Sequence, residues 1–178
     1  MKKSSALAYV GHNSKNNRVK NDFYPTPFEA TQSLLNRQKF DGEIWECACG
    51  DGSMSKVLID NGYNVCSSDL IDRGYGEVGI DFLNSNKKVD NIITNPPFNL
   101  STEFTIKALN LANNKVAMLN KLSFLEGIKR KNQVFTLNKL KKVWVFSQRV
   151  KFGGNGLMAF AWFIFDVNYN GKPQIDWI

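Results

Sequence analysis

The sequence predicts an α/β fold built on a mostly parallel, buried sheet. Stretches typical of strands alternate with stretches typical of helices from about residue 22 onward. The strand-like stretches are near-continuous apolar runs, as in sheets that helices cover on both faces. The chain has 178 residues, 43% of them apolar, which fits one compact domain. We expect a single domain over residues 22–178, preceded by a flexible basic tail over residues 1–21.

The predicted elements follow one another with short connections. The first part of the domain comprises a helix over residues 27–37, a strand over 43–48, a glycine turn over 49–52, a helix over 53–62 and a strand over 63–69. The second part comprises strands over 89–95, 115–120, 142–146 and 158–167, with helices over 101–114 and 125–138. A turn-rich stretch over 147–157 separates the last two strands. The stretch 43–69 is a βαβ unit, and its connection is expected to be right-handed.

Local sequence signals justify the ends of two of these helices. Thr26 is a plausible N-cap, and Pro27 suits a first helical turn because proline lacks a backbone N–H. Ser53 is expected to cap the helix over 53–62, and Gly62 to end it. Aromatic residues in the last two strands are interpreted as core because they lie inside apolar runs, namely Trp144, Phe146, Phe160, Trp162, Phe163 and Phe165.

Polar residues that can bind a ligand follow the predicted strands at their carboxyl ends, where open α/β sheets bind ligands. Gly50 and Gly52 allow a tight turn and a close approach of the backbone to a ligand. Asp69 ends the next strand, where a carboxylate can accept hydrogen bonds from ribose hydroxyls. Ser55 stands where the dinucleotide pattern has its third glycine, which counts against NAD. A ligand that contains a nucleoside is therefore predicted.

The stretch "TNPPF", residues 94–98, ends a run of β-branched residues. Pro96 and Pro97 donate no backbone hydrogen bond and restrict φ, so they stop the strand and stiffen the turn. Asn95 then offers an amide oxygen and Pro96 a carbonyl oxygen, two acceptors that suit an exocyclic NH2 group. Phe98 offers a face on which a planar base could stack.

Positive charge is unevenly distributed along the chain. The formal net charge is +7, and ten Lys or Arg residues lie between Lys115 and Lys151 against Glu126 alone. Such asymmetry indicates a polyanionic partner, nucleic acid first and an anionic membrane surface second. The candidates for phosphate contacts are Lys129, Arg130, Lys131, Lys141, Lys142, Arg149 and Lys151.

The numbers of cysteine and histidine residues and the lengths of the apolar runs indicate where the protein resides and which kinds of site it lacks. Three cysteines argue against a disulfide framework and for the cytoplasm. The only histidine, His12, lies in the predicted tail and is interpreted as an incidental surface residue. The apolar run at residues 6–10 is too short for a secretory signal, and no run reaches a membrane span. No metal site is expected.

Taken with these motifs, the chain resembles the S-adenosylmethionine-dependent methyltransferases, specifically the adenine-specific DNA methyltransferases that methylate N6. The resemblance rests on "WECACGDGSMSKVL", "CSSDL", "IDFL", "ITNPPF" and the preceding "DFYPTP". "SFLEGIKR" and "AFAWFIF" look like small, phage-type members of the group. The resemblance covers about residues 22–166 and implies a Rossmann-like class I methyltransferase fold with a mostly parallel seven-stranded sheet, helices on both faces and an antiparallel C-terminal strand. It also implies the cytoplasm of a bacterial host cell.

The resemblance assigns roles to individual positions. The methionine part of S-adenosylmethionine would be bordered by Tyr24, Pro25 and Thr26, and its centre by Glu46, Cys49, Gly50 and Gly52. Asp69 would bind the ribose, Asp81 the adenine amino group and Phe82 the adenine face, while Asn95, Pro96, Pro97 and Phe98 would form the catalytic turn. Cys47 departs from the pattern, because many members have proline there.

These assignments predict direct in-line methyl transfer to the N6 amine of an adenine that is flipped out of a duplex or single-stranded. Methylation of RNA adenine or of a glutamine side chain remains an alternative, because similar turns serve those substrates. A second alternative is a catalytically inactive module that binds nucleic acid and regulates. No separate target-recognition domain is expected, so loops, relaxed specificity or a partner would determine the target, and a homo-oligomer remains open.

Overall fold

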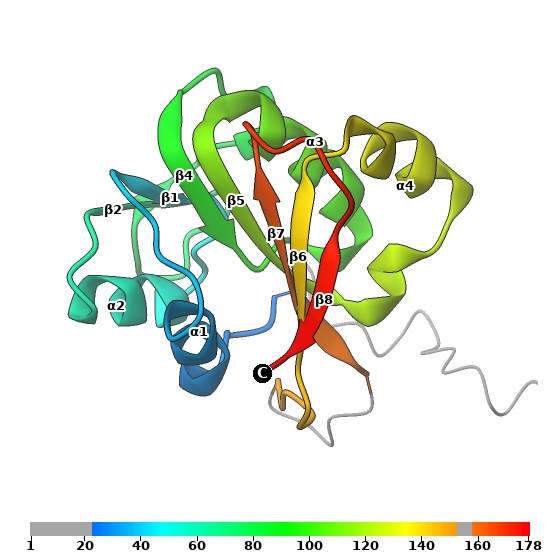
Figure 1. Ribbon diagram of the computed structural model, residues 1–178. Helices are drawn as coiled ribbons and strands as arrows, with labels where there is room; N and C mark the ends of the chain where they lie inside the picture. The colour runs from blue at the N-terminus through cyan, green and yellow to red at the C-terminus, as the bar shows by residue number, and fades with distance from the viewer. Residues whose placement is uncertain (1–22, 153–157) are drawn as a thin grey trace, which may run out of the picture.

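One eight-stranded sheet runs through the part of the chain that the computed structural model describes, residues 23–152 and 158–178 (Figure 1). The strand order is β3-β2-β1-β4-β5-β7-β6-β8. The strands are β1 (Ile44–Glu46), β2 (Val65–Asp69), β3 (Glu77–Val78), β4 (Val89–Thr94), β5 (Ala112–Lys121), β6 (Leu140–Val145), β7 (Phe160–Asp166) and β8 (Gln174–Trp177). This arrangement confirms the predicted α/β class.

Parallel pairing dominates the sheet. Strands β3, β2, β1, β4 and β5 pair with one another in parallel, in that order, and β6 is parallel to β8. Strand β7 runs antiparallel to both β5 and β6, as expected for the last predicted strand. The short edge strands β3 and β8 were not predicted. They bring the sheet to eight strands, where the sequence patterns predict six and the resemblance implies seven. Their side chains are exposed, so neither forms an apolar run.

Helices cover both faces of the sheet. On one face lie α1 (Phe28–Leu35) and α2 (Ser53–Asp60), which pack residues such as Leu34 and Leu58 against the sheet. On the other lie α3 (Ser101–Leu111) and α4 (Ile128–Gln133), with Phe104 and Val134 in the core. Short 3-10 turns complete the chain, namely η4 (Phe82–Asn84), η5 (Phe98–Leu100), η6 (Leu122–Leu125) and η7 (Phe135–Leu137).

Two of the predicted helix caps are wrong. Pro27, and not Thr26, is the N-cap of α1, and Thr26 instead bonds a side chain of the candidate site. Ser53 is the first residue of α2, and its backbone N–H and hydroxyl both donate to Oδ1 of Asp51. Gly62 ends α2 as predicted: at φ +86° its N–H donates to Ile59, and the next N–H to Leu58.

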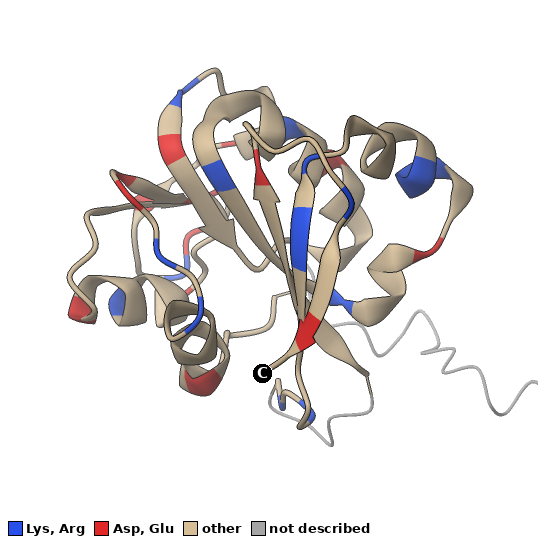
Figure 2. Ribbon diagram, viewed as in Figure 1, with Lys and Arg blue, Asp and Glu red and all other residues tan. Residues whose placement is uncertain are grey.

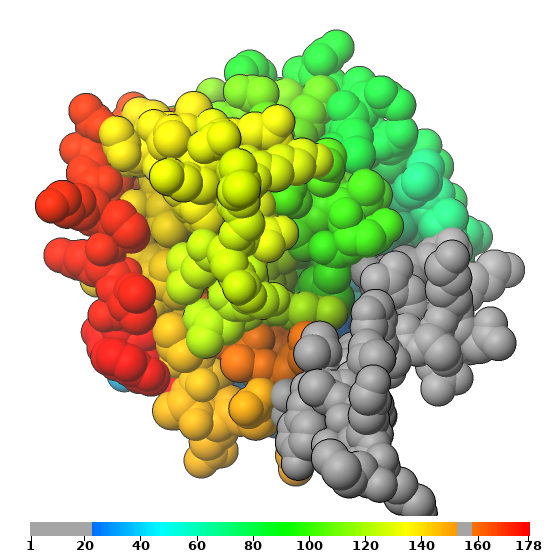
Figure 3. All heavy atoms as spheres, turned by 90° about the vertical axis from the view of Figure 1, so that its right-hand side faces the viewer, coloured from blue at the N-terminus to red at the C-terminus, as the bar shows by residue number. Residues whose placement is uncertain are grey.

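The predicted helix over 125–138 is wrong in extent. Only residues of α4 are α-helical there, and 3-10 turns lie on either side. Gly127 has φ +109°, a conformation that does not belong to a helix. Asn138 adopts φ +54° and ends the second turn. The segment therefore wraps the sheet as short turns, and in the space-filling view it lies between α3, in green, and β8, in red (Figure 3).

The aromatic residues of β6 and β7 form core, as predicted. Trp162, Phe163 and Phe165 are fully buried, Trp144 and Phe160 nearly so, and Phe146 is half-buried. The indole nitrogen of Trp162 donates to the carbonyl oxygen of Ala30, which ties α1 to the sheet.

The predicted tail over residues 1–21, with His12, lies outside the described residues, as do residues 153–157 of the stretch 147–157. Among the residues that the structure describes, no helix has the length and apolar character that crossing a bilayer requires. The division into tail and domain stays a prediction.

Candidate active site

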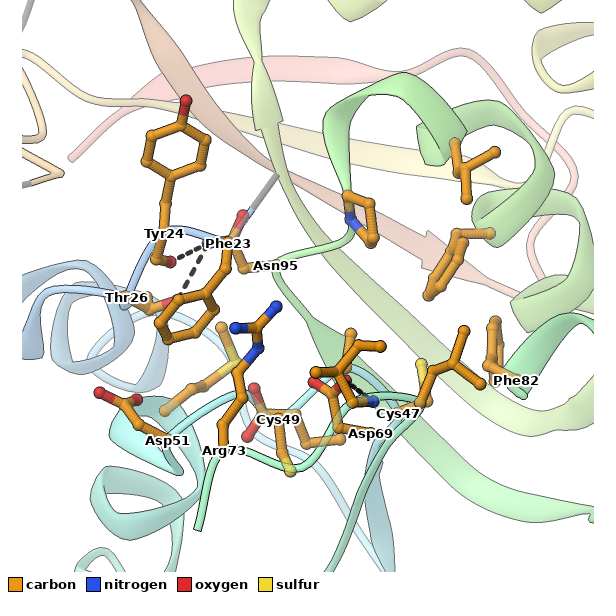
Figure 4. Close-up of a pocket in the computed structure, with 18 of the residues that line it drawn as sticks. Phe23, Tyr24, Thr26, Cys47, Cys49, Asp51, Asp69, Arg73, Phe82 and Asn95 are labelled. Atoms are coloured by element: carbon orange, nitrogen blue, oxygen red, sulfur yellow. Dashed lines mark hydrogen bonds between the residues drawn. The ribbon is translucent and has the colours of Figure 1, made fainter. Parts of the chain in front are cut away.

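A cavity of about 580 Å³ opens at the carboxyl ends of β1, β2 and β4. Its wall is built from the residues that follow these strands, together with residues 23–26 and the turn η4 (Figure 4). Parallel strands bring their carboxyl ends to the same edge, so segments far apart in sequence meet there. The cavity size is typical of sites for small organic ligands.

The glycine turn after β1 is shaped by close packing. Gly50 and Gly52 have φ of +57° and +78°, conformations that favour glycine. A Cβ on Gly50 would lie 2.3 Å from the ring of Phe23, and one on Gly52 would lie 2.4 Å from the ring of Tyr75. Neither glycine lines the cavity; from this turn Cys49, Asp51 and Ser53 do. The glycines thus let two aromatic rings pack directly on the turn, and one of them, Phe23, also lines the cavity.

Glu46 and its hydroxyl partners are buried beside the cavity. The hydroxyl of Ser67 donates to that of Ser55 at 2.7 Å, and the hydroxyl of Ser55 donates to Oε2 of Glu46. Burial raises the pKa of Glu46 to about 8, and the nearby carboxylates of Asp69 and Asp51 add to the rise. The carboxyl is therefore protonated at neutral pH, and a cation placed beside it would favour its ionised form.

Asp69 and Asp81 line the cavity as predicted. Oδ2 of Asp69 accepts the N–H of Gly50 at 2.8 Å, and Oδ1 accepts the N–H of Ile71 at 2.8 Å. Asp81 accepts the N–H of Leu83 at 3.0 Å and caps η4. Each carboxylate oxygen keeps a further lone pair, so both residues can still accept from a ligand.

An apolar wall faces these carboxylates. Phe82 is 2% exposed, and its ring packs against Trp45 and Phe104 at centroid distances of 5.2 and 4.9 Å. Further apolar wall residues were missed in the sequence, namely Leu70, Ile71, Ile80, Leu83 and Leu100. The available signal was proximity in sequence, because each lies within two residues of Asp69, Asp81, Phe82 or Phe98.

The cysteine thiols beside the cavity are shielded. Burial raises the pKa of Cys49 to about 12 and that of Cys47 well above its usual range. Both residues lie in the cavity wall. Among the residues described, no group of three or more His, Cys, Asp or Glu side chains could hold a metal ion.

The side-chain amide of Asn95 is held in one orientation (Figure 4). Its Nδ2 donates to the carbonyl oxygen of Tyr24 at 3.2 Å and to Oγ1 of Thr26 at 3.1 Å. A carbonyl oxygen only accepts, so Nδ2 and not Oδ1 must face Tyr24. Oδ1 is buried and has no hydrogen-bond partner within the described residues. Asn95 therefore brings an unused acceptor to the cavity wall.

The remaining residues of the turn, Pro96, Pro97 and Phe98, differ in whether they line the cavity. Pro97 lines the cavity, whereas Pro96 is buried and does not. Phe98 lies outside the cavity, where its ring stacks on Tyr24 at 5.7 Å and packs on Phe160 at 5.4 Å. Of residues 24–26, all three line the cavity, as expected.

The seven candidate phosphate contacts do not form one patch (Figure 2). Lys129 pairs with Glu103, and Arg130 donates to the carbonyl oxygen of Ser123, so both lie near the residues that follow β5. Arg149 and Lys151 follow β6, and Lys131 lies on α4. Lys141 and Lys142 lie near the start of β6. Because β5 and β6 run in the same direction, the start of β6 lies at the end of the sheet opposite to the residues that follow β5. Lys141 pairs there with Asp166 at 2.9 Å.

Comparison with solved structures shows which known fold the chain has. No family model and no curated protein matches the sequence. The structure is similar to a Listeria monocytogenes protein assigned as a class I S-adenosylmethionine-dependent methyltransferase, with TM-score 0.67, 12% identity and coverage of 92% of this chain and 68% of that one. It is also similar to the modification subunit assigned to a type I restriction enzyme of Vibrio vulnificus (TM-score 0.62, 14% identity, 88% of this chain). A Pyrococcus horikoshii protein assigned as an RNA methyltransferase gives TM-score 0.61 at 16% identity, covering 85% of this chain and 88% of that one.

The chain thus has the Rossmann-like fold of the class I methyltransferases. It spans about half the length, 47%, of the Vibrio modification subunit. At these identities the likeness concerns the fold, and the activity has to be argued from the site.

Proposed function

We infer that the protein is an S-adenosylmethionine-dependent methyltransferase that acts on the exocyclic N6 amine of adenine in DNA. The observation that carries this inference is the orphaned Oδ1 of Asn95. Its amide nitrogen is fully engaged by Tyr24 and Thr26, so the oxygen is fixed and free to accept. A buried acceptor without a partner costs about 1–3 kcal/mol, so a ligand N–H that satisfies it would be bound favourably.

The cavity fits S-adenosylmethionine in its chemistry. Phe82, Ile80 and Leu83 offer an apolar wall to the adenine ring, with Asp81 beside them to accept from its amino group. The carboxylate of Asp69 suits the ribose hydroxyls. Asp51 favours the positive charge of the amino and sulfonium groups, and Glu46 would add to this once the bound cation favours its ionised form.

The residues of the turn would orient the amine of the target base. Oδ1 of Asn95 would accept one N–H. The carbonyl oxygen of Pro96, which does not itself line the cavity, would accept the other once the base reaches the turn. The two bonds would favour a pyramidal nitrogen and stabilise the charge developing on it. Bound S-adenosylmethionine supplies the methyl group: its C–S bond breaks as the N–C bond forms, sulfur keeps the electron pair, and the nitrogen loses a proton to solvent. A base in a duplex would have to flip out to reach Asn95.

The basic chain favours a nucleic acid over a protein as the substrate. We propose DNA because "ITNPPF" and the glycine turn resemble the adenine-specific DNA methyltransferases. RNA and a glutamine side chain are the alternatives, and structures of similar fold include proteins assigned to DNA modification and to RNA methylation.

Methyl transfer from labelled cofactor to DNA, RNA and a glutamine peptide tests the proposal in parallel. We expect transfer to adenine in DNA, and a loss of about 10²- to 10³-fold in kcat for Asn95→Ala with cofactor affinity retained. Asn110→Ala, on the exposed side of α3, is the matched control and should keep full activity. Cofactor binding without transfer to any substrate would instead indicate a regulatory module.

A further inference from the structure

A second, smaller hollow lies on the other side of the Asn-Pro-Pro-Phe turn from the cavity. It has a volume of about 60 Å³ and shares no residue with the cavity wall. The rings of Phe98 and Phe124 line it, together with the polar side chains of Asn120, Lys121, Ser123 and Arg130. We call it the β5 hollow, because Asn120 and Lys121 are the last residues of β5.

Asn120 is a buried amide without a partner. The residue is 1% exposed, and neither Oδ1 nor Nδ2 has a hydrogen-bond partner within the described residues. Burying an unpaired amide costs free energy that an apolar side chain of similar shape would avoid. Asn91, another buried asparagine on the neighbouring strand, differs in its nitrogen: Nδ2 donates to the carbonyl oxygens of Asp41 and Glu43 at 2.7 and 3.4 Å, and only Oδ1 lacks a partner within the described residues.

The position of Asn120 places it beside the turn that holds Asn95. Strands β4 and β5 are adjacent and parallel, and the last paired positions are Thr94 and Met118. Two residues further along each strand, at Pro96 and at Asn120, the chain reaches the end of the sheet where the parallel strands have their carboxyl ends. Asn120 therefore reaches the same edge as Asn95, on the Phe98 side of the turn.

Cations and aromatic rings frame the hollow. Nζ of Lys121 lies 4.9 Å from the ring centroid of Phe98, and the guanidinium of Arg130 lies 5.4 Å from that of Phe124. Arg130 keeps further donors beyond those bonded to Ser123 and Glu126. Flat rings suit a planar heterocycle, and cations suit the phosphates attached to it.

We propose that the β5 hollow takes the edge of a nucleobase and that Asn120 reads it. This inference rests on the proposed function. Both N–H groups of the target amine are assigned to Asn95 and Pro96, so Nδ2 of Asn120 would donate to the adenine ring nitrogen next to that amine, an acceptor at this edge of the base. The volume is too small for a whole base, so only an edge enters. Asn120 would thus determine specificity, and Asn95 would orient the amine.

The variant Asn120→Leu, compared with Asn91→Leu, tests the proposal. Three quantities are measured for each: Tm, kcat/KM for methyl transfer to adenine-containing DNA, and the affinity for a single strand that contains adenine relative to the same strand with an abasic position. We expect Asn120→Leu to raise Tm by a few degrees and to lower kcat/KM about 10- to 100-fold. It should also remove the preference for adenine over the abasic strand. Asn91→Leu should lower Tm and leave that preference unchanged.

A purely structural asparagine would behave in the opposite way. If Asn120→Leu lowers Tm and keeps the preference for adenine, the proposal is overturned while the proposed function stands. If the wild-type protein methylates nothing, the proposed function fails, and the binding measurement still decides the role of Asn120. Equal binding of both strands by the wild type would overturn the proposal directly.

Discussion

Nδ2 of Asn95 lies 3.1 Å from Oγ1 of Thr26, so a residue before the first helix fixes an amide that follows β4. Replacing Thr26 by valine keeps the shape of the side chain and removes the acceptor. We expect Thr26→Val to lower kcat about tenfold, because one of the two bonds that orient Asn95 is lost. Steady-state kinetics with a saturating cofactor concentration measure the effect.

Thr31→Val is the matched control for this substitution. Thr31 is fully buried on α1, and its hydroxyl has no partner within the described residues. Its replacement should leave kcat unchanged and keep or raise stability. Equal losses of kcat in the two variants would show that Thr26 does not position Asn95.

Gly52 and Gly62 allow backbone strain and steric clash to be separated. Both have positive φ, +78° and +86°, but a Cβ would meet the Tyr75 ring at Gly52 and nothing within 4 Å at Gly62. Gly62→Ala should cost about 1–2 kcal/mol of unfolding free energy. Gly52→Ala should cost roughly 1–3 kcal/mol more. Urea unfolding measures both, and adding Tyr75→Ala to Gly52→Ala should recover the excess.

The buried carboxyl of Glu46 predicts a pH dependence of stability. Burial raises its pKa from 4.5 to about 8 in the folded protein. The neutral folded carboxyl therefore contributes stability fully below pH 4.5, and this contribution is lost progressively as the pH rises to about 8. Glu46→Gln, which is neutral throughout, should remove this decline and be more stable than the wild type at pH 9, by a difference on the order of a few kcal/mol. Parallel stability curves of the two proteins from pH 5 to 9 would contradict this.

The candidate phosphate contacts lie at two ends of the sheet, so removing charges at one end or at the other should affect nucleic-acid binding unequally. Lys129→Ala combined with Lys131→Ala removes charges from α4, whereas Lys141→Ala combined with Lys142→Ala removes charges from the opposite edge of the sheet. Each phosphate contact that is lost should reduce the slope of log affinity against log salt by about 0.9. We expect a reduced slope for the first pair and an unchanged slope for the second. Salt titrations of DNA binding measure this.

The placement of Asp69 and Asn95 could be predicted from sequence because it follows from strand direction alone. Both residues end parallel strands, and parallel strands share a carboxyl edge, whatever packs around them. The same rule applied to β5 selects Asn120, which was missed because the prediction used only the ends of the strands over 43–48, 63–69 and 89–95.

The surroundings of Phe98 could not be predicted in this way. Its neighbours come from residues 24, 152 and 160, and no local pattern records which of them a ring will meet. Strand β8 escaped prediction for a different reason: it has four residues, and its two apolar residues, Ile175 and Trp177, are too few to make an apolar run. Lys141 and Lys142 were grouped with the other cations because they are close to them in sequence. Proximity in sequence does not determine at which end of the strands a residue lies.

Tyr24 belongs to both sides of the turn: its carbonyl oxygen holds the amide of Asn95, and its ring stacks on Phe98. A ligand that displaces this residue from one side alters the geometry on the other. Ligands that bind the cavity and the β5 hollow as proposed would therefore be thermodynamically linked through Tyr24. By reciprocity, each occupant changes the affinity of the other by the same factor.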